Sequence, residues 1–575
     1  MSSLSPGLVP MLLALLIPFL RGRLRQAYLL LIPIASYAFL LWLRREVGLE
    51  ASPVLAVLGY DALPVHIDRL SFVFGTVFHL ALFLGLLYSL HVEDPLQHVA
   101  ACIYAGATIG ATFAGDLLLL FVFWEVVALA STFLIWARRT ERSYRAGQRY
   151  LIVQVASGVL LLAGTLLLAR EGHGLRFGPL SLSTGAGKLI FLAFGIKCAF
   201  PLLHTWLVDA YPEATPTGTV FLSAFTTKLA VYALARSFAG APELIWIGAV
   251  MTLFPIFYAV IEDDLRRVLS YSMINQIGFM VVGIGLGTKL AIDGAAAHAF
   301  ADVVFKGLLF MAMGAVLQQT GKVACSELGG LHKAMPFTAA CCLVGAASIS
   351  AFPLTSAFAT KSLIMDAAAG QHLVALWFVL LFASAGVLHH AGIKIPFFAF
   401  FAYDAGLRPA RPPLNMRAAM GLGALLCVGI GCFPGLLYRL LPYPEVAAEY
   451  QVYSAYHVVS QLQLLLCAAL AFVVLRRKEL EPPEIPSTNL DADWVVRRPL
   501  YGVWELVRRG AGAVARGFTT LVLETLPRQA AAFVQGYGAE RGALRGLSTI
   551  GSSILVVLGL LFLFLLVGQG LAPTG

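Results

Sequence analysis

The sequence predicts an all-α, polytopic membrane protein, and three observations lead to this fold class. Of the 575 residues, 59% are hydrophobic, only 12% are charged, and the mean hydropathy is +0.83. Soluble domains carry roughly 25% charged residues, so the composition excludes a soluble domain, a disordered chain and a disulfide scaffold. At about 20 residues for each span, the chain is long enough for about fifteen membrane helices.

Apolar runs mark the expected helices. The first run, 7–20, is followed by Arg21, Arg23 and Arg25 and has no small-residue cleavage site, so we expect a retained span and not a signal peptide. The other runs read as further helices of the same kind. They cover residues 26–43, 69–90, 98–114, 115–137, 149–170, 186–200, 216–238, 244–261, 268–288, 291–317, 336–366, 373–402, 416–440, 457–475 and 551–569.

Basic residues gather at the ends of these runs. The chain has 40 Lys and Arg against 31 Asp and Glu, and such a balance favours a nucleic-acid or a membrane partner. Here the loops after odd-numbered runs hold about twice as many Lys and Arg as the loops after even-numbered runs. We therefore expect a multi-pass cell-membrane protein with its N-terminus outside and its Arg-rich loops in the cytoplasm, and no nucleic-acid partner.

Two prolines interrupt the helical pattern. Pro201 follows Lys197 and precedes the polar stretch 204–209, whereas Pro353 lies inside the run 336–366, eight residues before Lys361. Proline in a helix removes a hydrogen bond and breaks or kinks the helix. Broken backbone at membrane depth is tolerated only against protein or a wet cavity. Breaks in corresponding parts of two halves indicate an inverted-repeat transporter, and ordinary kinks are the alternative.

The composition changes after residue 478. Residues 481–486 read as a Pro-rich linker, and 491–549 mixes apolar residues with arginines before the final run. This pattern predicts an amphipathic segment along the cytoplasmic membrane surface that clamps a neighbouring subunit. The alternative is a small cytoplasmic domain, but so short a segment makes a poor independent core.

Ionisable residues inside the spans are the main candidates for function. Each costs about 2.5–3.5 kcal/mol at a helix centre, so such residues must pair, face water or shift their pKa values. Charges of mixed sign in several spans favour a proton pathway over a purely structural network. The candidates are Glu125, Lys197, Lys228, His298, Asp302, Lys306 and Lys361.

Spacing and sign suggest partners among these residues. His298, Asp302 and Lys306 follow one another at intervals of four, which places them along one stripe of a helix. The order of acid and base favours an i,i+4 pair, and histidine titrates near neutrality. We expect Asp302 to be a switchable partner of Lys306, with a structural ion pair as the alternative. We also expect Glu125 to pair with Lys197 and gate proton uptake.

No pattern of catalysis, cofactor binding or metal ligation is found. The eight cysteines include no CxxC, so iron–sulfur and zinc sites are not expected. Residues 184–189 lack the first glycine and the final Ser/Thr of a phosphate loop, and 283–287 lies in a helix. The adjacent His389 and His390 point to different helix faces. We therefore expect a transport subunit without catalytic residues, cofactors, metals or a redox centre of its own.

Several motifs carry a resemblance to a known family. The sequence resembles the antiporter-like membrane subunits of respiratory complex I, membrane-bound hydrogenases and Mrp-type sodium/proton antiporters, over about residues 65–440. The resemblance implies a core of about fourteen helices with two inverted five-helix repeats, each with a broken helix. The motifs are Phe123-Trp124-Glu125, Gly195-Ile196-Lys197, 201–210 with Pro216-Thr217, 264–272 through Gln276-Ile277-Gly278, and His298 through Lys306.

The resemblance also implies a division of the chain. Its expected parts are N-terminal helices at 1–97, a first repeat at 98–261, a second repeat at 262–440, an additional helix at 441–478, a linker with the amphipathic segment at 479–550, and a final span at 551–575.

Roles carry over residue by residue. Glu125 and Lys197 resemble the family's proton-input pair, Lys228 its connecting lysine, Lys306 its central lysine and Lys361 its exit-side lysine. His298 matches a family histidine, whereas Asp302 departs, because many members have histidine there.

Within the family, the chain is most similar to the D-type component of Mrp-type sodium/proton antiporters. This similarity implies a proton-translocating subunit that assembles with other hydrophobic subunits. The alternatives are a pumping subunit of an NADH:quinone oxidoreductase, of a membrane-bound hydrogenase or of an inorganic-carbon uptake complex. Whether sodium is the exchanged cation stays open.

Overall fold

The computed structural model describes residues 4–48, 54–57 and 60–480 continuously, and a few positions beyond them. Those positions are 482, 484–486, 489–492, 494, 502, 505, 508, 509, 512, 520, 524–526, 528, 529, 532 and 559. The chain divides into two units, Met1–Asn489 and Leu490–Gly575. The first unit is a bundle of helices. The predicted amphipathic segment 491–549 lies outside the described residues, apart from scattered positions, and so does the final span.

The described part is helical except for one short hairpin, which confirms the predicted fold class. Among the described residues, eleven helices are long and apolar enough to cross a membrane. The helices in chain order are α1 (Leu8–Ala14), η1 (Ile17–Phe19), α2 (Gly22–Val47), α3 (Arg69–Ser89), α4 (Pro95–Phe113), α5 (Leu117–Trp136), α6 (Glu141–Arg170), α7 (Gly185–Lys197), α8 (Thr205–Ala210), η2 (Tyr211–Glu213), α9 (Gly218–Ala224), α10 (Thr226–Ser237), α11 (Pro242–Ile261), α12 (Leu265–Leu286), α13 (Lys289–Thr320), η3 (Cys325–Glu327), α14 (Pro336–Ile349), α15 (Ser356–Gly370), α16 (Val374–Val387), η4 (Leu388–Ile393), α17 (Lys394–Pro396), η5 (Phe397–Phe401), α18 (Leu414–Cys432), α19 (Pro434–Tyr438), α20 (Pro444–Glu449) and α21 (Ala455–Arg477). The hairpin pairs β1 (Leu55–Val57) with β2 (Tyr60–Ala62) in antiparallel register, and the sequence did not predict it.

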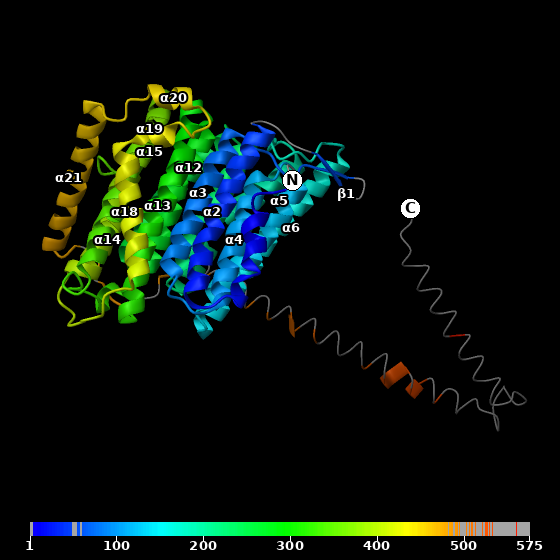
Figure 1. Cartoon of the computed structure of the whole chain (residues 1–575), viewed down its shortest axis with the longest axis horizontal. Helices are drawn as coiled ribbons and strands as arrows, with labels where there is room; N and C mark the ends of the chain where they lie inside the picture. Colours follow the sequence, from blue (N-terminus) through cyan, green and yellow to red (C-terminus); the bar gives the residue numbers. More distant parts are fainter. Residues whose placement is uncertain are drawn as a thin grey trace, which may run out of the picture. The chain divides into compact units, whose positions relative to one another are not determined.

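The helices stand side by side in a row from α21 at one end, through α12 and α13, to α5 and α6 at the other (Figure 1). In their apolar windows, α12 is 100% buried and α13 is 94% buried, whereas α21 is only 11% buried. Helix α13 packs on α3, α9, α12, α14, α15 and α18. The centre of the bundle is therefore enclosed by protein, while α21 leaves most of its surface exposed.

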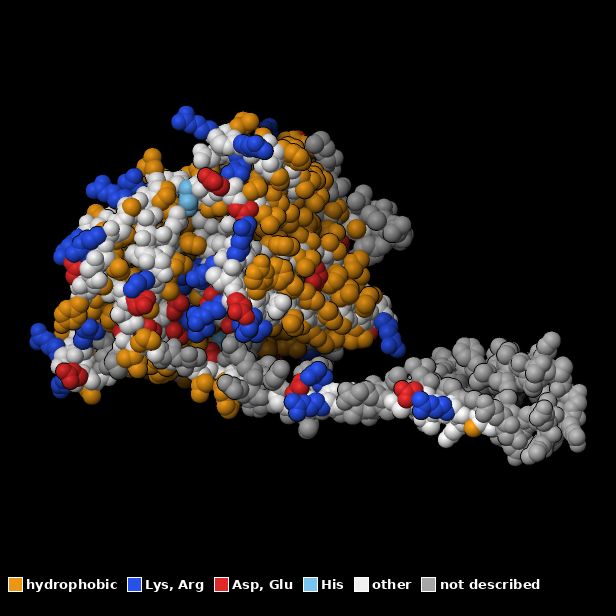
Figure 2. Space-filling model, turned by 90° about the horizontal axis from the view of Figure 1, so that it is seen from below, with side chains coloured by type: hydrophobic (Ala, Val, Ile, Leu, Met, Phe, Trp, Pro, Cys, Tyr) orange, Lys and Arg blue, Asp and Glu red, His pale blue; other side chains and the backbone are white. Residues whose placement is uncertain are grey.

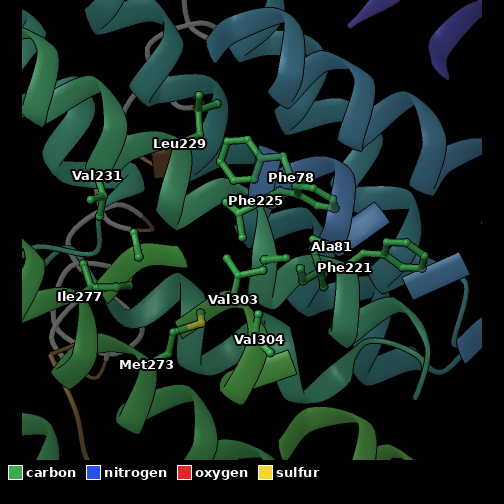
Figure 3. Close-up of a cluster of buried hydrophobic side chains, with 14 of the residues drawn as sticks. Phe78, Ala81, Phe221, Phe225, Leu229, Val231, Met273, Ile277, Val303 and Val304 are labelled. Carbon is green, nitrogen blue, oxygen red and sulfur yellow. The ribbon is translucent and has the colours of Figure 1, made fainter. Parts of the chain in front are cut away.

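A dry cluster of side chains fills this centre. Phe78 of α3, Phe221 of α9 and Phe225 meet Met273 of α12 and Val303 of α13 (Figure 3). All five are at most 4% exposed. The cluster joins four helices and excludes water around them, which strengthens any charge interaction placed nearby.

Two helices approach closely through glycine. A Cβ on Gly278 of α12 would lie 2.7 Å from the backbone nitrogen of Thr252 and 2.8 Å from the carbonyl oxygen of Gly248, both in α11. Backbones of membrane helices pack this closely only where side chains are small. The contact fixes α12, which carries several of the polar residues described below.

Aspartates begin several of the helices. Asp68 caps α3, accepting a 2.7 Å hydrogen bond from the Ser71 N–H, and pairs at 2.6 Å with Arg236 of α10. Burial alone would raise the pKa of the Asp68 carboxyl. The hydrogen bond to His66, the charge of Arg236 and the cap outweigh burial and hold that pKa well below its usual range.

The two proline breaks have the same sequence and the same backbone. Each consists of Ala-Phe-Pro-Leu, at 199–202 and at 351–354. In both, the alanine and the leucine are left-handed, with φ of 61° and 69° in the first break and 57° and 69° in the second. The phenylalanine N–H bonds to the carbonyl five residues before it and the alanine N–H to the carbonyl three residues before it. This Schellman arrangement ends each helix, so the two halves are interrupted by one repeated device.

Two further interruptions were not predicted. The run 216–238 divides at Phe225 into α9 and α10, although it holds no proline after its first residue. The Tyr104 hydroxyl takes up the freed Thr226 N–H at 3.0 Å, which stabilises this break. The run 373–402 contains the π-helical turns η4 and η5, and such turns often mark functional positions.

Candidate functional site

The seven predicted residues lie on five helices of the bundle, namely α5, α7, α10, α13 and α15. Lys197, Lys228 and the three residues of α13 are fully buried, Lys361 is 3% exposed, and Glu125 is half-buried. A set of buried lysines in one bundle is costly, so the partner of each one decides what the set can do.

Glu125 and Lys197 form the first group. Lys197 ends α7, and its ammonium donates a 2.6 Å hydrogen bond to the Trp124 carbonyl and lies 4.4 Å from the centre of the Trp124 ring. The Glu125 carboxylate rests on the bare backbone of Gly158 in α6, where any Cβ would collide with Oε1. The two charges lie close enough to interact. Glu125 is therefore the less buried member of this group, and its Oε1 has no hydrogen-bond partner among the described residues.

Trp124 is held in place by a second hydrogen-bonded chain. Its indole N–H donates to Ser157 Oγ at 3.0 Å, and the Ser157 hydroxyl donates to the Ala193 carbonyl at 2.7 Å. The chain joins α5, α6 and α7, which fixes the indole face under the Lys197 ammonium.

Lys228 and Asp302 form an ion pair between α10 and α13. The Lys228 Nζ lies 2.5 Å from Asp302 Oδ2, and both side chains are fully buried. Lys228 also donates to the Ser223 carbonyl at 2.9 Å, an acceptor left free by the break between α9 and α10. The contact with Asp302 lacks hydrogen-bond geometry, so the carboxylate keeps unused acceptor capacity.

The structure differs here from the expected partner of Asp302. Lys306 donates to Ser272 Oγ of α12 at 2.9 Å, and Asp302 contacts Lys228 of the other half. Asp302 and Lys306 still lie close enough for their charges to interact. The i,i+4 rule considers only neighbours on one helix, whereas a tightly buried helix meets partners from several others.

His298 joins α13 to its neighbours on both sides. Its Nε2 donates to Gln276 Oε1 of α12 at 3.2 Å, and its Nδ1 meets Thr360 Oγ1 of α15 at 3.0 Å. Thr360 directly precedes Lys361. The imidazole therefore bridges the central helix to the segment that carries the last predicted lysine.

Lys361 has no hydrogen-bond partner among the described residues, and its ammonium lies 4.4 Å from the centre of the Phe279 ring. It borders a pocket of about 400 Å³ whose lining also includes Asp366, His457 and the exposed Tyr456. Asp366 and His457 lie 3.1 Å apart. Lys361 therefore ends the row of charges beside a mainly apolar pocket that also holds Asp366 and His457.

Comparison with known proteins shows the family to which the chain belongs. A family model described as NADH:quinone oxidoreductase/Mrp antiporter, TM, matches residues 114–387. NAD(P)H-quinone oxidoreductase chain 4 1 of Synechococcus elongatus is 30% identical over 389 residues, which cover 62% of this chain and 72% of that protein. The chain belongs to this family of membrane subunits. The resemblance predicted from the motifs is confirmed.

The chain is also similar to parts of longer proteins. Hydrogenase-4 component B of Escherichia coli is 32% identical over 270 residues, 42% of this chain and 40% of that protein. The A-type component of the Na(+)/H(+) antiporter of Alkalihalophilus pseudofirmus is 29% identical over 503 residues, 76% of this chain and 62% of that protein. The chain thus spans about two fifths to three fifths of these relatives.

A solved structure shows the same fold. A chain of the Mrp complex from Dietzia sp. DQ12-45-1b superposes with a TM-score of 0.69 at 22% identity, covering 80% of this chain and 99% of that chain. The antiporter-like fold that the resemblance implied is therefore the fold observed.

Two arginines near the starts of α12 and α6, to which the sequence analysis gave no role of their own, hold the segment after the first break. The buried Arg266 donates to the carbonyls of Pro212 at 2.8 Å and Ala214 at 3.1 Å. Arg149 pairs with Asp209 through two hydrogen bonds of 2.7 and 3.0 Å. These contacts fix the backbone between α8 and α9 and thereby the approach to Lys228.

Sequence reasoning also missed Lys394, which is fully buried in α17. It lies inside the apolar run 373–402, so the rule that found the other buried charges would have found it too. The roles of Ser272, Gln276 and Thr360 were not predicted for a different reason, although the first two lie in the family motifs. Polar uncharged residues are common in membrane helices, and only their placement against His298 and Lys306 marks these three.

Proposed function

We propose that this chain is the proton-translocating subunit of a multi-subunit cation/proton antiporter of the Mrp type, similar to the D-type component, and that it is not itself an enzyme. Other hydrophobic subunits of the assembly would be its partners. The observation that carries the proposal is the fully buried ion pair of Lys228 with Asp302, which couples the two halves of the protein. The proposed pathway runs through Glu125, Lys197, Lys228, Asp302, Lys306, His298 and Lys361.

The chemistry of these side chains suits proton transfer better than structural support. A structural network would satisfy every charge, but Lys361 has no hydrogen-bond partner among the described residues and Asp302 keeps unused acceptor capacity. Two unit charges 4 Å apart interact by about 4 kcal/mol at an effective dielectric constant of about 20. A proton gained at one site therefore favours proton release at the next.

The arrangement suggests an order of events. Glu125, which is half-buried, takes up a proton and weakens its hold on Lys197. The Lys197 charge then acts on Lys228, and the Lys228–Asp302 pair opens or closes accordingly. When Asp302 leaves Lys228, it turns toward Lys306, whose proton can pass through the polar groups around His298 to Lys361. The repeated breaks at Pro201 and Pro353 provide the backbone freedom that these changes need.

A second assembly is favoured by the relatives themselves. The chain matches quinone oxidoreductase and hydrogenase components as well as antiporter subunits. The same pathway would serve as the pumping subunit of a quinone oxidoreductase, a membrane-bound hydrogenase or an inorganic-carbon uptake complex. The two proposals differ in what drives the protons and agree on the residues that carry them.

The deciding experiment purifies the tagged chain with its partners from native membranes and reconstitutes the complex in liposomes with an internal pH dye. An antiporter gives proton flux on a sodium or potassium gradient, whereas a redox pump gives flux only with electron donor and quinone. Glu125→Gln should abolish either flux, and the matched control Glu141→Gln, at an exposed glutamate of α6, should not. If Glu125→Gln retains full flux, the proposed role of Glu125 is wrong.

We also propose that the N-terminus lies outside and that the Arg-rich loops face the cytoplasm. A single cysteine at Arg139, in a cysteine-free background, should react with a membrane-impermeant maleimide in inside-out vesicles only. Labelling in right-side-out vesicles would reverse the orientation.

A further inference from the structure

Lys394 is a buried lysine that the proposed pathway does not use. It begins α17 directly after the π-helical turn η4 and is fully buried. Its ammonium donates a 2.6 Å hydrogen bond to the Val260 carbonyl near the end of α11. One carbonyl does not balance a buried charge, so a counter-ion is needed.

The counter-ion comes from the linker that follows α21. Glu484 Oε1 lies 2.9 Å from Lys394 Nζ, and the Glu484 side chain is 11% exposed. Five residues later, Asn489 donates to Glu262 Oε2 at 3.0 Å. The linker is thus attached through Glu484 to α17 and through Asn489 to the loop between α11 and α12, and these two residues are called the strap below. Charged side chains of both signs gather over this end of the helical body (Figure 2).

Two other groups surround Glu484. Asp263, Cys325 and Glu484 bring one potential ligand atom each to within 4.8 Å of one another. A metal ion is not favoured there, because Lys394 already neutralises Glu484 and Asp263 accepts hydrogen bonds from the N–H and hydroxyl of Ser326. The cluster is better described as two carboxylates with a thiol beside them.

His390 lies in η4, four residues before Lys394. Its ring is fully buried in η4, and its position brings it within electrostatic reach of both Lys306 and Lys394. No described side chain bonds to either ring nitrogen. The π-helical turn therefore places a titratable ring one turn before the lysine held by the strap and within electrostatic reach of the central lysine.

We propose that Lys394 and Glu484 form a second proton port, reached from Lys306 through His390 and closed by the strap. This inference rests on the proposed function. The Lys394 ammonium gives its proton to the Glu484 carboxylate, which leaves a neutral amine and a neutral carboxylic acid. Without the ion pair the strap lifts, and the partly exposed acid releases the proton to water and becomes a carboxylate again. His390 then passes a proton from Lys306 to the Lys394 amine, which restores the pair.

The placement of the strap can be tested independently of transport. In the assembled complex, Glu484→Cys should form a disulfide with Cys325 under copper–phenanthroline, detected as a cross-linked peptide by mass spectrometry. Burial and the neighbouring carboxylates raise the pKa of the Cys325 thiol, so the catalyst is needed. The disulfide should be absent when Cys325→Ser is added. Absence of the disulfide in the single variant would overturn the placement.

The role of the port is tested by proton flux per complex in reconstituted vesicles. Glu484→Gln should lower the flux at least about tenfold, as expected when a positioned proton acceptor is lost, and Glu484→Asp should restore part of it. The matched control is Glu479→Gln, at an exposed glutamate just before the strap. A merely structural pair would lower the yield of complex and leave the flux of each complex unchanged. Normal flux with Glu484→Gln therefore overturns the port.

A core variant in the same vesicles separates this inference from the proposed function. If Lys306→Ala abolishes flux while Glu484→Gln does not, the port is wrong and the main pathway stands. If neither variant changes the flux, the proposed function falls, and the port falls with it.

Discussion

Breaking the ion pair between Lys228 and Asp302 should separate stability from transport. Both side chains are fully buried and their charged atoms lie 2.5 Å apart. Removing one partner strands the other charge in the dry centre, at a cost of about 3–5 kcal/mol in the free energy of unfolding. Lys228→Met and Asp302→Leu should each destabilise the protein by about that amount, because Lys228 alone keeps only the Ser223 carbonyl and Asp302 alone keeps no hydrogen bond among the described residues.

The double variant Lys228→Met/Asp302→Leu should recover most of this loss. Replacing a buried ion pair by apolar side chains is often neutral or stabilising by about 1–4 kcal/mol. The surroundings favour this outcome, because Phe225, three residues before Lys228, and Val303, next to Asp302, belong to the buried apolar cluster of Figure 3. The double variant would be stable and still lack the ionisable link between the halves.

The assay measures two quantities on the same preparations. Thermal unfolding of the detergent-solubilised complex, followed by size-exclusion fluorescence, reports stability. Proton flux in liposomes, divided by the amount of complex, reports transport. We expect unstable and inactive single variants and a stable, inactive double variant. Substantial flux through the double variant would refute the role of the pair, and single variants as stable as the wild type would refute its energetic description.

Three further predictions concern other parts of the chain. Gly158→Ala should displace the Glu125 carboxylate, because the new Cβ overlaps its Oε1, and should lower flux strongly, whereas Gly174→Ala has open space and should be silent in the same vesicle assay. The lowered pKa of Asp68 means that its contribution to stability is present above about pH 4 and is lost as the pH falls below that value. Asp68→Asn should therefore make the unfolding temperature depend less on pH in the acid range. An unchanged dependence in that range would contradict this assignment. Truncation after Asn489 should keep the strap and the helical body but weaken copurification of partner subunits, and normal assembly of the truncated chain would contradict the clamp predicted for 491–549.

The sequence predicted the charged residues better than their partners. The free-energy cost of burying a charge was enough to identify the seven candidates, because an ionisable group within an apolar run is costly whichever residue it pairs with. The partner of Asp302 could not be predicted in this way, because helix periodicity describes one helix and Lys228 comes from another half of the chain. The break at Phe225 carries no proline or glycine and depends on Tyr104 of a distant helix.

Other features were present in the sequence and were not used. The tetrapeptide Ala-Phe-Pro-Leu occurs at both breaks, at 199–202 and at 351–354, and can be recognised from the sequence alone. Lys394 lies within an apolar run like the other lysines. The strap contact of Glu484 had no such signal, since a glutamate in a Pro-rich linker is expected to be solvated and only the fold brings it to Lys394.

The central claim is that buried lysines in the middle of the bundle carry protons, and two lysines of α13 test it most directly. Lys306 is fully buried and bonded to Ser272, whereas Lys289 is exposed at the start of the same helix. The measurement is proton flux per complex in liposomes for Lys306→Ala and Lys289→Ala under the gradient that drives the wild type. We expect Lys306→Ala to lose proton flux and Lys289→Ala to retain it. Equal flux in both variants would contradict the claim that the buried lysines carry protons.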